Sequence, residues 1–476
     1  NRAADASAAA SGGRKLRDLA AADGFVLELP GRAVMALGRN PAVKFITLDA
    51  EMRSTERVDS SRLATLYNQS IGATGLWSTA QSSLLSGLLS GSQSSPMTGA
   101  GIGVAVLDTG ITDRPDFRGP NGTSRVVANA LFNSKLLKTD DGHGHGTHVA
   151  GIVAGNSWHQ ADLTLKGKYI GVAPEANLIN VRVSDEQGKS YVSDVVDAID
   201  WVVANRLIYN IRVMNLSLVS SVAESHLTSV LDAAVERAWF SGIFVVVASG
   251  NKGPNTMVYP PANDPFVVSV GAADTMGTVA PGDDTIAPWS SYGTTQDGFS
   301  KPDVVAPGRQ IVSPLSSATA TMAKSNSSRI VDGSYIWMSG TSMAAPVVAG
   351  LAALAFQAHP EWTNDQVKWL LQQTATRLGS SLAPVIGQGA GEVNAAAVVG
   401  YSGVPGFANQ NLAISHWLVT SDGSTAYDSS SWSTASWSTA SWSTASWSTA
   451  SWSTASWSTS NDSTAVTDSA SVEEIE

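Results

Sequence analysis

The apolar residues of this chain follow different patterns before and after about residue 100, and the longest patterned region lies after it. Residues 102–107 are a continuous apolar run, which is typical of a strand buried on both faces. Further runs of this kind alternate with stretches that have helical spacing. The expected strands are 102–107, 213–218, 243–248 and 266–270, and the expected helices are 149–154 and 192–204. Strands separated by helices predict a mostly parallel sheet covered on both sides, so we expect one α/β domain over residues 101–400.

The first 60 residues have the pattern of a small α+β unit. A strand is expected at 25–29, a short helix at 30–37, and a second strand at 43–48, where apolar and polar residues alternate. So few large apolar side chains make a marginal core, and we expect this unit to dock on a partner. Residues 61–100 form a connection rich in Ser, Gly and Leu.

The region 401–476 differs in composition from the rest of the chain. It contains seven acidic residues and no Lys or Arg. Six tryptophans recur every five residues, at Trp432, Trp437, Trp442, Trp447, Trp452 and Trp457. Five residues turn a helix by about 500°, so these rings cannot form one helical stripe. Two interpretations remain open, namely a disordered low-complexity tail and a short β-rich docking segment.

Composition excludes several classes of function. With 40 acidic residues against 29 basic ones the net charge is -11, which argues against nucleic acid as a partner. The absence of cysteine excludes disulfides, thiolate metal sites and a cysteine nucleophile. No apolar run is long enough to predict a membrane span. The chain begins with Asn and without a signal peptide, so we expect a fragment whose beginning is missing.

The candidate nucleophile is Ser342, in the sequence Gly-Thr-Ser-Met-Ala-Ala-Pro that precedes a long Ala/Leu/Val segment. This pattern places the hydroxyl at or just before the N-terminus of a buried helix, where the helix dipole favours negative charge. A serine that forms a tetrahedral oxyanion needs such a setting. The alternative is a helix N-cap serine without catalytic function.

A serine nucleophile needs a base and a group that orients the base. Asp108 ends the run 102–107, and His145 lies in Gly-His-Gly-His-Gly-Thr-His between two glycines that allow close backbone approach. Asp108 alone has the alternative of a turn residue. The cluster of His143, His145 and His148 could also indicate zinc, but no Cys and no helical His-x-x-x-His pair supports that interpretation.

The order Asp, His, Ser in these three motifs resembles that of the subtilisin-like serine proteases, and the resemblance covers about residues 101–400. It implies a three-layer α/β subtilisin-like fold with a mostly parallel central sheet, preceded by a small α+β propeptide. It further implies that Ser342 is the nucleophile, His145 the general base and acid, and Asp108 the group that orients His145. Asn251, in Ser-Gly-Asn-Lys-Gly, would be the oxyanion donor together with the Ser342 N–H, although Asn in a glycine-rich turn is also common for its backbone geometry. His148 would be a packed or hydrogen-bonded neighbour of the His145 motif and would not act as the base.

The same resemblance implies that substrate peptides add as a strand between two edge segments. The implied substrate-binding residues are Gly188, Lys189 and Ser190 on one edge, Ser217, Leu218 and Val219 on the other, and Tyr259 near the floor of the primary pocket. Val219 stands where relatives commonly carry glycine. Val219 and Tyr259 would both reduce the pocket, so we expect cleavage after small or medium apolar residues. A cis bond is expected at Pro260-Pro261.

The resemblance also assigns residues 1–60 to part of an inhibitory propeptide, which predicts a secreted zymogen that cleaves itself between about residues 52 and 77. Protein or peptide substrates, the chain's own propeptide as inhibitor, and a monomeric state are expected. The chemistry needs no cofactor. Relatives often bind calcium, so the resemblance leaves a structural calcium ion open. Asp116 could occupy the family's early Asp position, with an ordinary surface Asp as the alternative. The loop 156–168 differs in length and lacks a string of oxygen ligands, so no metal site is assigned. Two alternatives remain. The chain could be an inactive relative that binds a partner without cutting it, or a surface-attachment protein in which the tail provides the main function and proteolysis is secondary.

Overall fold

A computed structural model of the chain describes residues 14–19, 24–28, 30–37, 39–40, 43, 62–78, 96–133, 135–380, 383–419 and 471–474. The chain divides into two compact units, Asn1–Thr55 and Glu56–Glu476. Three sequence predictions fall partly or wholly outside the described residues: the strand at 43–48 beyond residue 43, the serine-rich connection at residues 79–95, and the Trp repeats.

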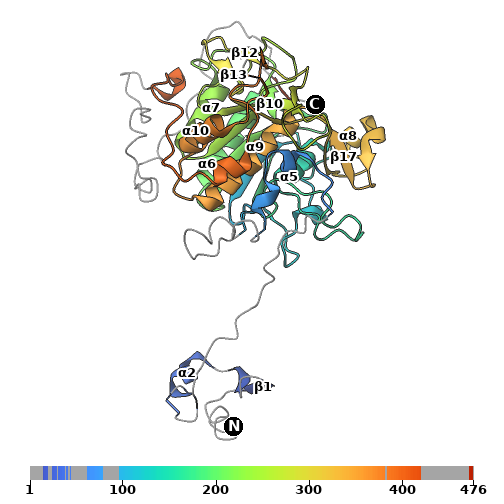
Figure 1. The fold of residues 1–476 in the computed structure, drawn as a ribbon, viewed down its shortest axis with the longest axis vertical. Coiled ribbons are helices and arrows are strands. Elements are labelled where there is room, and N and C mark those ends of the chain that lie inside the picture. The colour runs from blue at the N-terminus through green and yellow to red at the C-terminus, as the bar shows by residue number, and fades with distance from the viewer. Residues whose placement is uncertain are drawn as a thin grey trace. The chain divides into compact units, whose positions relative to one another are not determined.

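The first unit contains a hairpin and a helix (Figure 1). β1 (Arg14–Leu19) pairs antiparallel with β2 (Gly24–Glu28), and α2 (Gly31–Leu37) begins directly after Pro30. β2 and α2 lie close to the strand and the helix that were expected in this region. A proline here suits a helix start, because its fixed φ is compatible with helix and its missing N–H would have no partner there.

The second unit is built around a sheet of eight described strands. These are β3 (Gly103–Asp108), β4 (Val126–Leu131), β5 (Asn177–Arg182), β7 (Ile211–Leu216), β9 (Phe244–Ala248), β10 (Val268–Asp274), β11 (Thr285–Ile286) and β14 (Val304–Pro307). Their order is β11-β10-β9-β7-β3-β5-β4, with β14 also beside β10. Every neighbouring pair is parallel except β10 with β11. Since all residues of β3, β9 and β10 are buried, both faces of the sheet are covered.

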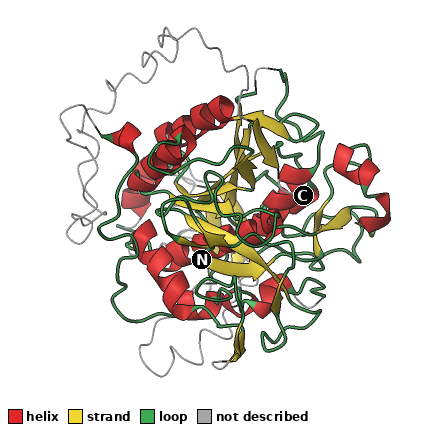
Figure 2. Cartoon of the chain, turned by 90° about the horizontal axis from the view of Figure 1, so that it is seen from above, coloured by secondary structure: helices red, strands yellow, loops and turns green. Residues whose placement is uncertain are grey.

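Helices cover the two faces of this sheet. The larger described helices are α5 (His145–Ala154), α6 (Val192–Asn205), α7 (Val230–Phe240), α9 (Thr341–Ala358), α10 (Asn364–Thr374) and α11 (Ala395–Val399). α5 packs against α9 and α6 packs against α7, and both pairs contact sheet strands. Figure 2 shows the strands in the middle with helices around them. The predicted three-layer α/β fold with a mostly parallel sheet is therefore confirmed.

α9 is the central helix of this unit and contacts β7, β9, β10 and β14. By length and composition it could cross a membrane, but 89% of its apolar window is buried inside the protein. The apolar run after Ser342 therefore serves the core, and Phe356 near its C-terminal end packs edge-on against Phe244 of β9.

Shorter elements complete the second unit. They are α3 (Tyr67–Ser70), η2 (Thr74–Leu76), η3 (Pro115–Phe117), β6 (Lys189–Tyr191), β8 (Leu218–Ser220), β12 (Gly293–Thr294), β13 (Ser300–Lys301), β15 (Ile311–Pro314), α8 (Thr321–Ser325), η4 (Ser327–Arg329), β16 (Ile330–Val331), β17 (Tyr335–Met338), β18 (Gly379–Ser380), β19 (Ala383–Pro384), η5 (His416–Leu418) and β20 (Ser471–Glu474). They form small sheets in the orders β12-β13, β15-β17-β16, β18-β19 and β6-β20-β8. The single strand expected over 213–218 is two strands separated by Ser217, since β7 pairs in the large sheet and β8 pairs with β20.

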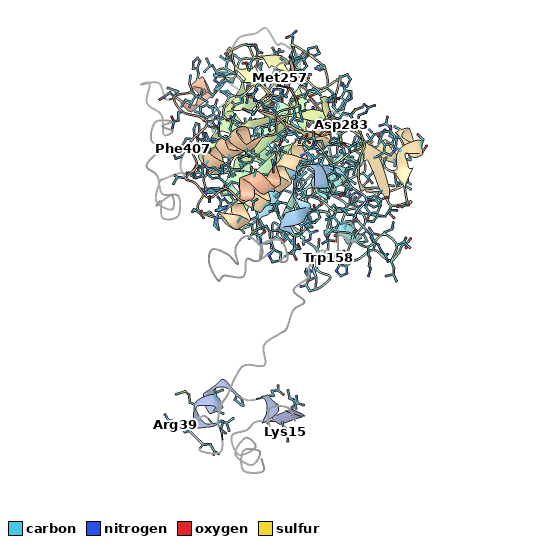
Figure 3. All side chains as sticks on the ribbon, viewed as in Figure 1. Lys15, Arg39, Trp158, Met257, Asp283 and Phe407 are labelled. Atoms are coloured by element: carbon cyan, nitrogen blue, oxygen red, sulfur yellow. The ribbon has the colours of Figure 1, made fainter. Side chains whose placement is uncertain are left out.

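Segments on both sides of residues 101–400 pack on the same core. Before it, the Tyr67 hydroxyl donates to the Ile170 carbonyl at 2.9 Å, and Trp77 Nε1 donates to the Val172 carbonyl at 3.0 Å. After it, Leu418 is buried and the His416 N–H donates to Leu227 O. Among the labelled side chains of Figure 3, Met257 is a core residue and Trp158 packs against the core from outside.

Candidate active site

Asp108 is the last residue of β3 and is buried. Its Oδ1 accepts hydrogen bonds from the Thr109 N–H at 2.8 Å and from the Thr109 hydroxyl at 3.3 Å. The end of a parallel strand is a common position for functional residues, because neighbouring strands end at the same edge of the sheet. Asp108 is therefore a fixed acceptor at this edge.

His145 is the first residue of α5, and its imidazole faces Asp108. Nδ1 lies 2.8 Å from Oδ1 and 3.0 Å from Oδ2 of the carboxylate, and both side chains are almost completely buried. A carboxylate accepts only, so Nδ1 carries the proton and Nε2 is the basic nitrogen of the neutral ring. The predicted partners Asp108 and His145 are thus brought together in the geometry that orients a general base.

Two glycines allow the backbone around His145 to take this path. Gly144 is the N-cap of α5 and has φ +109°, a conformation that other residues rarely adopt. A Cβ on Gly146 would overlap the carbonyl oxygen of Gly110 and lie 2.9 Å from Asp108 Oδ1. The glycines on either side of His145 therefore have separate functions, one in the turn and one in the close approach to Asp108.

The buried carboxylate of Asp141 ties this turn to β3, a role the sequence analysis missed. Oδ1 accepts from the Gly144 N–H at 2.6 Å and from the Thr109 hydroxyl at 2.8 Å, and Oδ2 accepts from the Thr147 N–H at 2.8 Å. The Thr109 hydroxyl in turn accepts from the Gly146 N–H at 2.9 Å. An Asp shortly before a helix start is a recognisable capping signal, but its link to Thr109 depends on the fold.

Ser342 is the second residue of α9, so it lies inside the first helical turn rather than at the N-cap. The N-cap is Gly340, which has no side chain. This excludes the alternative of an N-cap serine. The Ser342 hydroxyl lies 3.4 Å from the Ser217 carbonyl oxygen, and the Ser217 hydroxyl donates to the Ser342 carbonyl at 3.0 Å. α5 and α9 pack together, so one helix pair carries both His145 and Ser342.

Asn251 follows β9, and its carboxamide is oriented by α9. Oδ1 accepts from the Thr341 N–H at 3.0 Å and from the Thr341 hydroxyl at 3.1 Å, while the Gly250 N–H donates to that hydroxyl at 3.1 Å. Because the oxygen end of the amide is held by Thr341, the NH₂ end lies on the opposite side. Thr341 is a second positioning residue that the sequence analysis did not single out.

The predicted substrate-binding residues lie on two short edge strands. Lys189 and Ser190 belong to β6, with Gly188 just before it, while Leu218 and Val219 belong to β8, with Ser217 just before it.

Tyr259 is half-buried, and Lys252 Nζ lies 3.9 Å from the centre of its ring. The Ser220 N–H donates to the Pro260 carbonyl, which joins β8 to the segment of Tyr259, and the Pro260-Pro261 bond is cis as expected.

His148 is a structural residue, as the sequence predicted. It is buried, and Nε2 lies 3.1 Å from the Ile311 carbonyl oxygen and 3.0 Å from that of Ile336. Burial, with a smaller effect from His145, lowers the pKa of His148 to about 3, so the ring stays neutral and donates to these carbonyls. His143 is also buried, with its ring 6.3 Å from that of His145.

The surroundings of Asp116 do not suit a calcium ligand, and its side chain is buried rather than at the surface. The Tyr335 hydroxyl donates to Oδ1 at 2.6 Å, and Gln160 Nε2 donates to Oδ2 at 2.8 Å. Both carboxylate oxygens therefore have neutral donors, while calcium prefers several oxygen ligands that face one cation. Among the residues that the structure describes, no group of three or more His, Asp or Glu could hold a metal ion.

Comparison with known proteins agrees with this geometry. Residues 99–391 match the model of the subtilase family. Serine protease AprX of Bacillus subtilis is 39% identical over 305 residues, which are 62% of this chain and 65% of AprX, slightly under two thirds of its length. Subtilisin BL of Lederbergia lenta is 36% identical over 301 residues, 63% of this chain and 91% of that protein. A solved structure described as a psychrophilic protease has 32% identity and a TM-score of 0.50, covering 62% of this chain and 92% of its own.

Proposed function

The chain belongs to the subtilase family, and on that premise we propose that it is a serine endopeptidase whose catalytic residues are Asp108, His145 and Ser342. The observation that carries the proposal is the buried contact between His145 Nδ1 and the Asp108 carboxylate at 2.8 Å. His145 begins α5, and α5 packs against α9, the helix that contains Ser342. In a buried His–Asp pair of this kind the carboxylate keeps the proton on Nδ1, so that Nε2 can act as the base for a serine hydroxyl, as in a catalytic triad.

In the proposed reaction Ser342 Oγ attacks the carbonyl carbon of a peptide bond while His145 Nε2 takes the hydroxyl proton. The tetrahedral intermediate collapses as His145 gives that proton to the leaving amine, and an acyl-enzyme on Ser342 remains. Water then attacks the ester with His145 again as base, which releases the acid and restores Ser342. Asp108 keeps the proton on Nδ1 and stabilises the imidazolium.

The oxyanion of each tetrahedral intermediate would be bound by Asn251 Nδ2 and by the Ser342 N–H. Two observations support this assignment: Thr341 holds the opposite end of the Asn251 amide, and Ser342 lies in the first turn of α9, where N–H groups have no helical acceptor. Loss of one such donor typically lowers kcat about 10²–10³-fold.

Substrate peptides would bind as an added strand between β6 and β8, with Tyr259 and Val219 limiting the primary pocket. Val219 lies on β8, one of the two strands that would bind the substrate, and a valine there leaves less room than glycine, which supports the expected preference for small or medium apolar residues before the cut. Profiling with a peptide library tests this preference, and strongest cleavage after Phe or Tyr would contradict it.

The remaining expectations are that the chain is a secreted, monomeric zymogen and that the unit Asn1–Thr55 is part of a propeptide that inhibits it. The short hairpin and the seven-residue helix described in that unit support a segment that must dock. Mass spectrometry of the mature protein would locate the processing site, and a mature chain that still begins before residue 52 would argue against it.

The activity is tested by labelling with a fluorophosphonate probe, with Ser342→Ala as the matched control. Labelling and casein hydrolysis that vanish in Ser342→Ala support the proposal. If neither chain is labelled, even after limited proteolysis to remove a bound propeptide, the inactive binding protein becomes the better interpretation. The rival in which the tail does the main work is tested by a truncation after Val419, which keeps the buried Leu418 in place.

A further inference from the structure

The C-terminal segment of the chain lies between the two edge strands assigned to substrate. β20 pairs antiparallel with β6 on one side and with β8 on the other, in the order β6-β20-β8. Val472 lies opposite Ser190 in one ladder and opposite Ser220 in the other. β20 thus supplies main-chain partners for both edges at once, as an added peptide strand does.

The direction of β20 is that of a substrate approaching the nucleophile. Glu474 lies opposite Leu218, and the preceding residue on that side is Ser217, whose carbonyl oxygen is 3.4 Å from Ser342 Oγ. In an antiparallel pair, a peptide that continued this register would place its next residue opposite Ser217. Since Ser217 lies beside the proposed nucleophile, the carbonyl group of a bond to be cut would lie near that position.

We propose that the segment containing β20 is an internal competitive inhibitor. It occupies the site between β6 and β8 where the substrate residues before the cut bond would bind, and a substrate must displace it. Inhibition by β20 rests on the proposed function, whereas the docking of β20 between β6 and β8 does not. Because β20 and a substrate would pair with the same edges, only one of them can be bound at a time.

Two features make this occupancy reversible. A four-residue strand gains its affinity from main-chain pairing over a short length, so a longer peptide substrate can replace it. The pairing is also confined to three residue pairs on each side of β20, so few main-chain hydrogen bonds must break when a substrate enters. Covalent attachment makes the docking independent of protein concentration.

Docking is tested by a disulfide, for which a chain without cysteine is well suited. In a full-length Ser342→Ala background, which prevents self-cleavage, Val472→Cys is combined with Ser220→Cys. Directly opposite residues in an antiparallel pair have Cα atoms about 4.5–5.5 Å apart, within the disulfide range. The matched control combines Val466→Cys with Ser220→Cys, six residues earlier in the chain. Rapid cross-linking of the first pair only is expected, and equal or absent cross-linking of both pairs would overturn the proposal.

Inhibition is tested by kinetics in the active protein, with mass spectrometry confirming that the C-terminal residues are retained. Val472→Pro removes an N–H from the ladder, and Val466→Pro is the control with the same change outside β20. We expect the apparent KM of a peptide substrate to fall roughly threefold or more in Val472→Pro only, with kcat unchanged, because a competitor reduces the fraction of open sites. Equal KM values would refute inhibition. If no variant hydrolyses peptides or reacts with fluorophosphonate, the proposed function fails, while the disulfide result still decides the docking.

Discussion

The hydroxyl of Ser217 donates a hydrogen bond to the main-chain carbonyl of Ser342 at 3.0 Å. In a regular helix this carbonyl would accept from the N–H four residues later, but that residue is Pro346, which has no N–H. The Ser217 hydroxyl, just before β8, therefore donates to this carbonyl in place of the N–H that residue 346 lacks. Asn215 Nδ2 donates to the same hydroxyl at 3.0 Å and orients it.

This replacement predicts a specific coupling between Ser217 and Pro346. Ser217→Ala should lower the free energy of unfolding by about 1–3 kcal/mol, because the buried Ser342 carbonyl loses this hydrogen bond. Pro346→Ala restores the helical N–H, so the same Ser217→Ala change should cost about 1 kcal/mol less in the Pro346→Ala chain. Urea unfolding of the four proteins in the Ser342→Ala background measures the coupling, and strict additivity would contradict it.

Gly146→Ala should strongly reduce activity. The new Cβ would overlap the Gly110 carbonyl oxygen and press on the Asp108 carboxylate, so His145 and Asp108 must separate. We expect kcat to fall at least about 100-fold, since a displacement of about 1 Å can cost that much. The control is Gly282→Ala, where a Cβ meets nothing within 4 Å. Similar peptide hydrolysis by both variants would show that the close approach has no catalytic importance.

Asp141→Ala should destabilise the start of α5. The buried N–H groups of Gly144 and Thr147 lose this acceptor, and the Thr109 hydroxyl keeps only its longer contact with Asp108. The expected loss in unfolding free energy is at least about 2 kcal/mol. We also expect slower fluorophosphonate labelling, because these contacts hold the turn that carries His145. Asp141→Asn, which keeps one oxygen acceptor, should lie between the parent and Asp141→Ala. A parent-like labelling rate in all three would contradict the positioning role.

The buried pair of Glu392 and Asp284 predicts a loss of stability at alkaline pH. Burial, together with the Asp284 carboxyl, raises the pKa of Glu392 from 4.5 to about 9. The folded chain therefore keeps a proton that the unfolded chain releases at much lower pH. This contribution is fully present below pH 4.5 and is lost as the pH rises toward 9, by at most about 1.4 kcal/mol per pH unit.

Glu392→Gln removes this titration, so its unfolding free energy should decline less steeply with pH than that of the parent. Urea unfolding of both chains in the Ser342→Ala background, at several pH values between about 6 and 9, measures the difference. Parallel curves for the two chains would show that Glu392 does not hold the proton.

The sequence alone determined the fold class and the motifs of the candidate site. Apolar runs such as 102–107 predicted buried parallel strands, because a strand covered on both faces has no polar side. The glycines beside His145 and the small residues before Ser342 predicted turns into helices, since these signals act within a few residues. The order of Asp108, His145 and Ser342 then indicated the family, which the comparisons confirmed.

Only the tertiary structure decided how these segments support one another. The bonds of Asp141 to Thr109, of Thr341 to Asn251, and of Ser217 to Ser342 join residues that lie 32, 90 and 125 positions apart in the chain. The pairing of β20 with β6 and β8 is equally non-local. Local propensity and hydrophobic spacing carry no information on such contacts, because their geometry depends on how the sheet and helices pack. For this reason the sequence predicted which residues could react, and the packing determined which residues hold them in place.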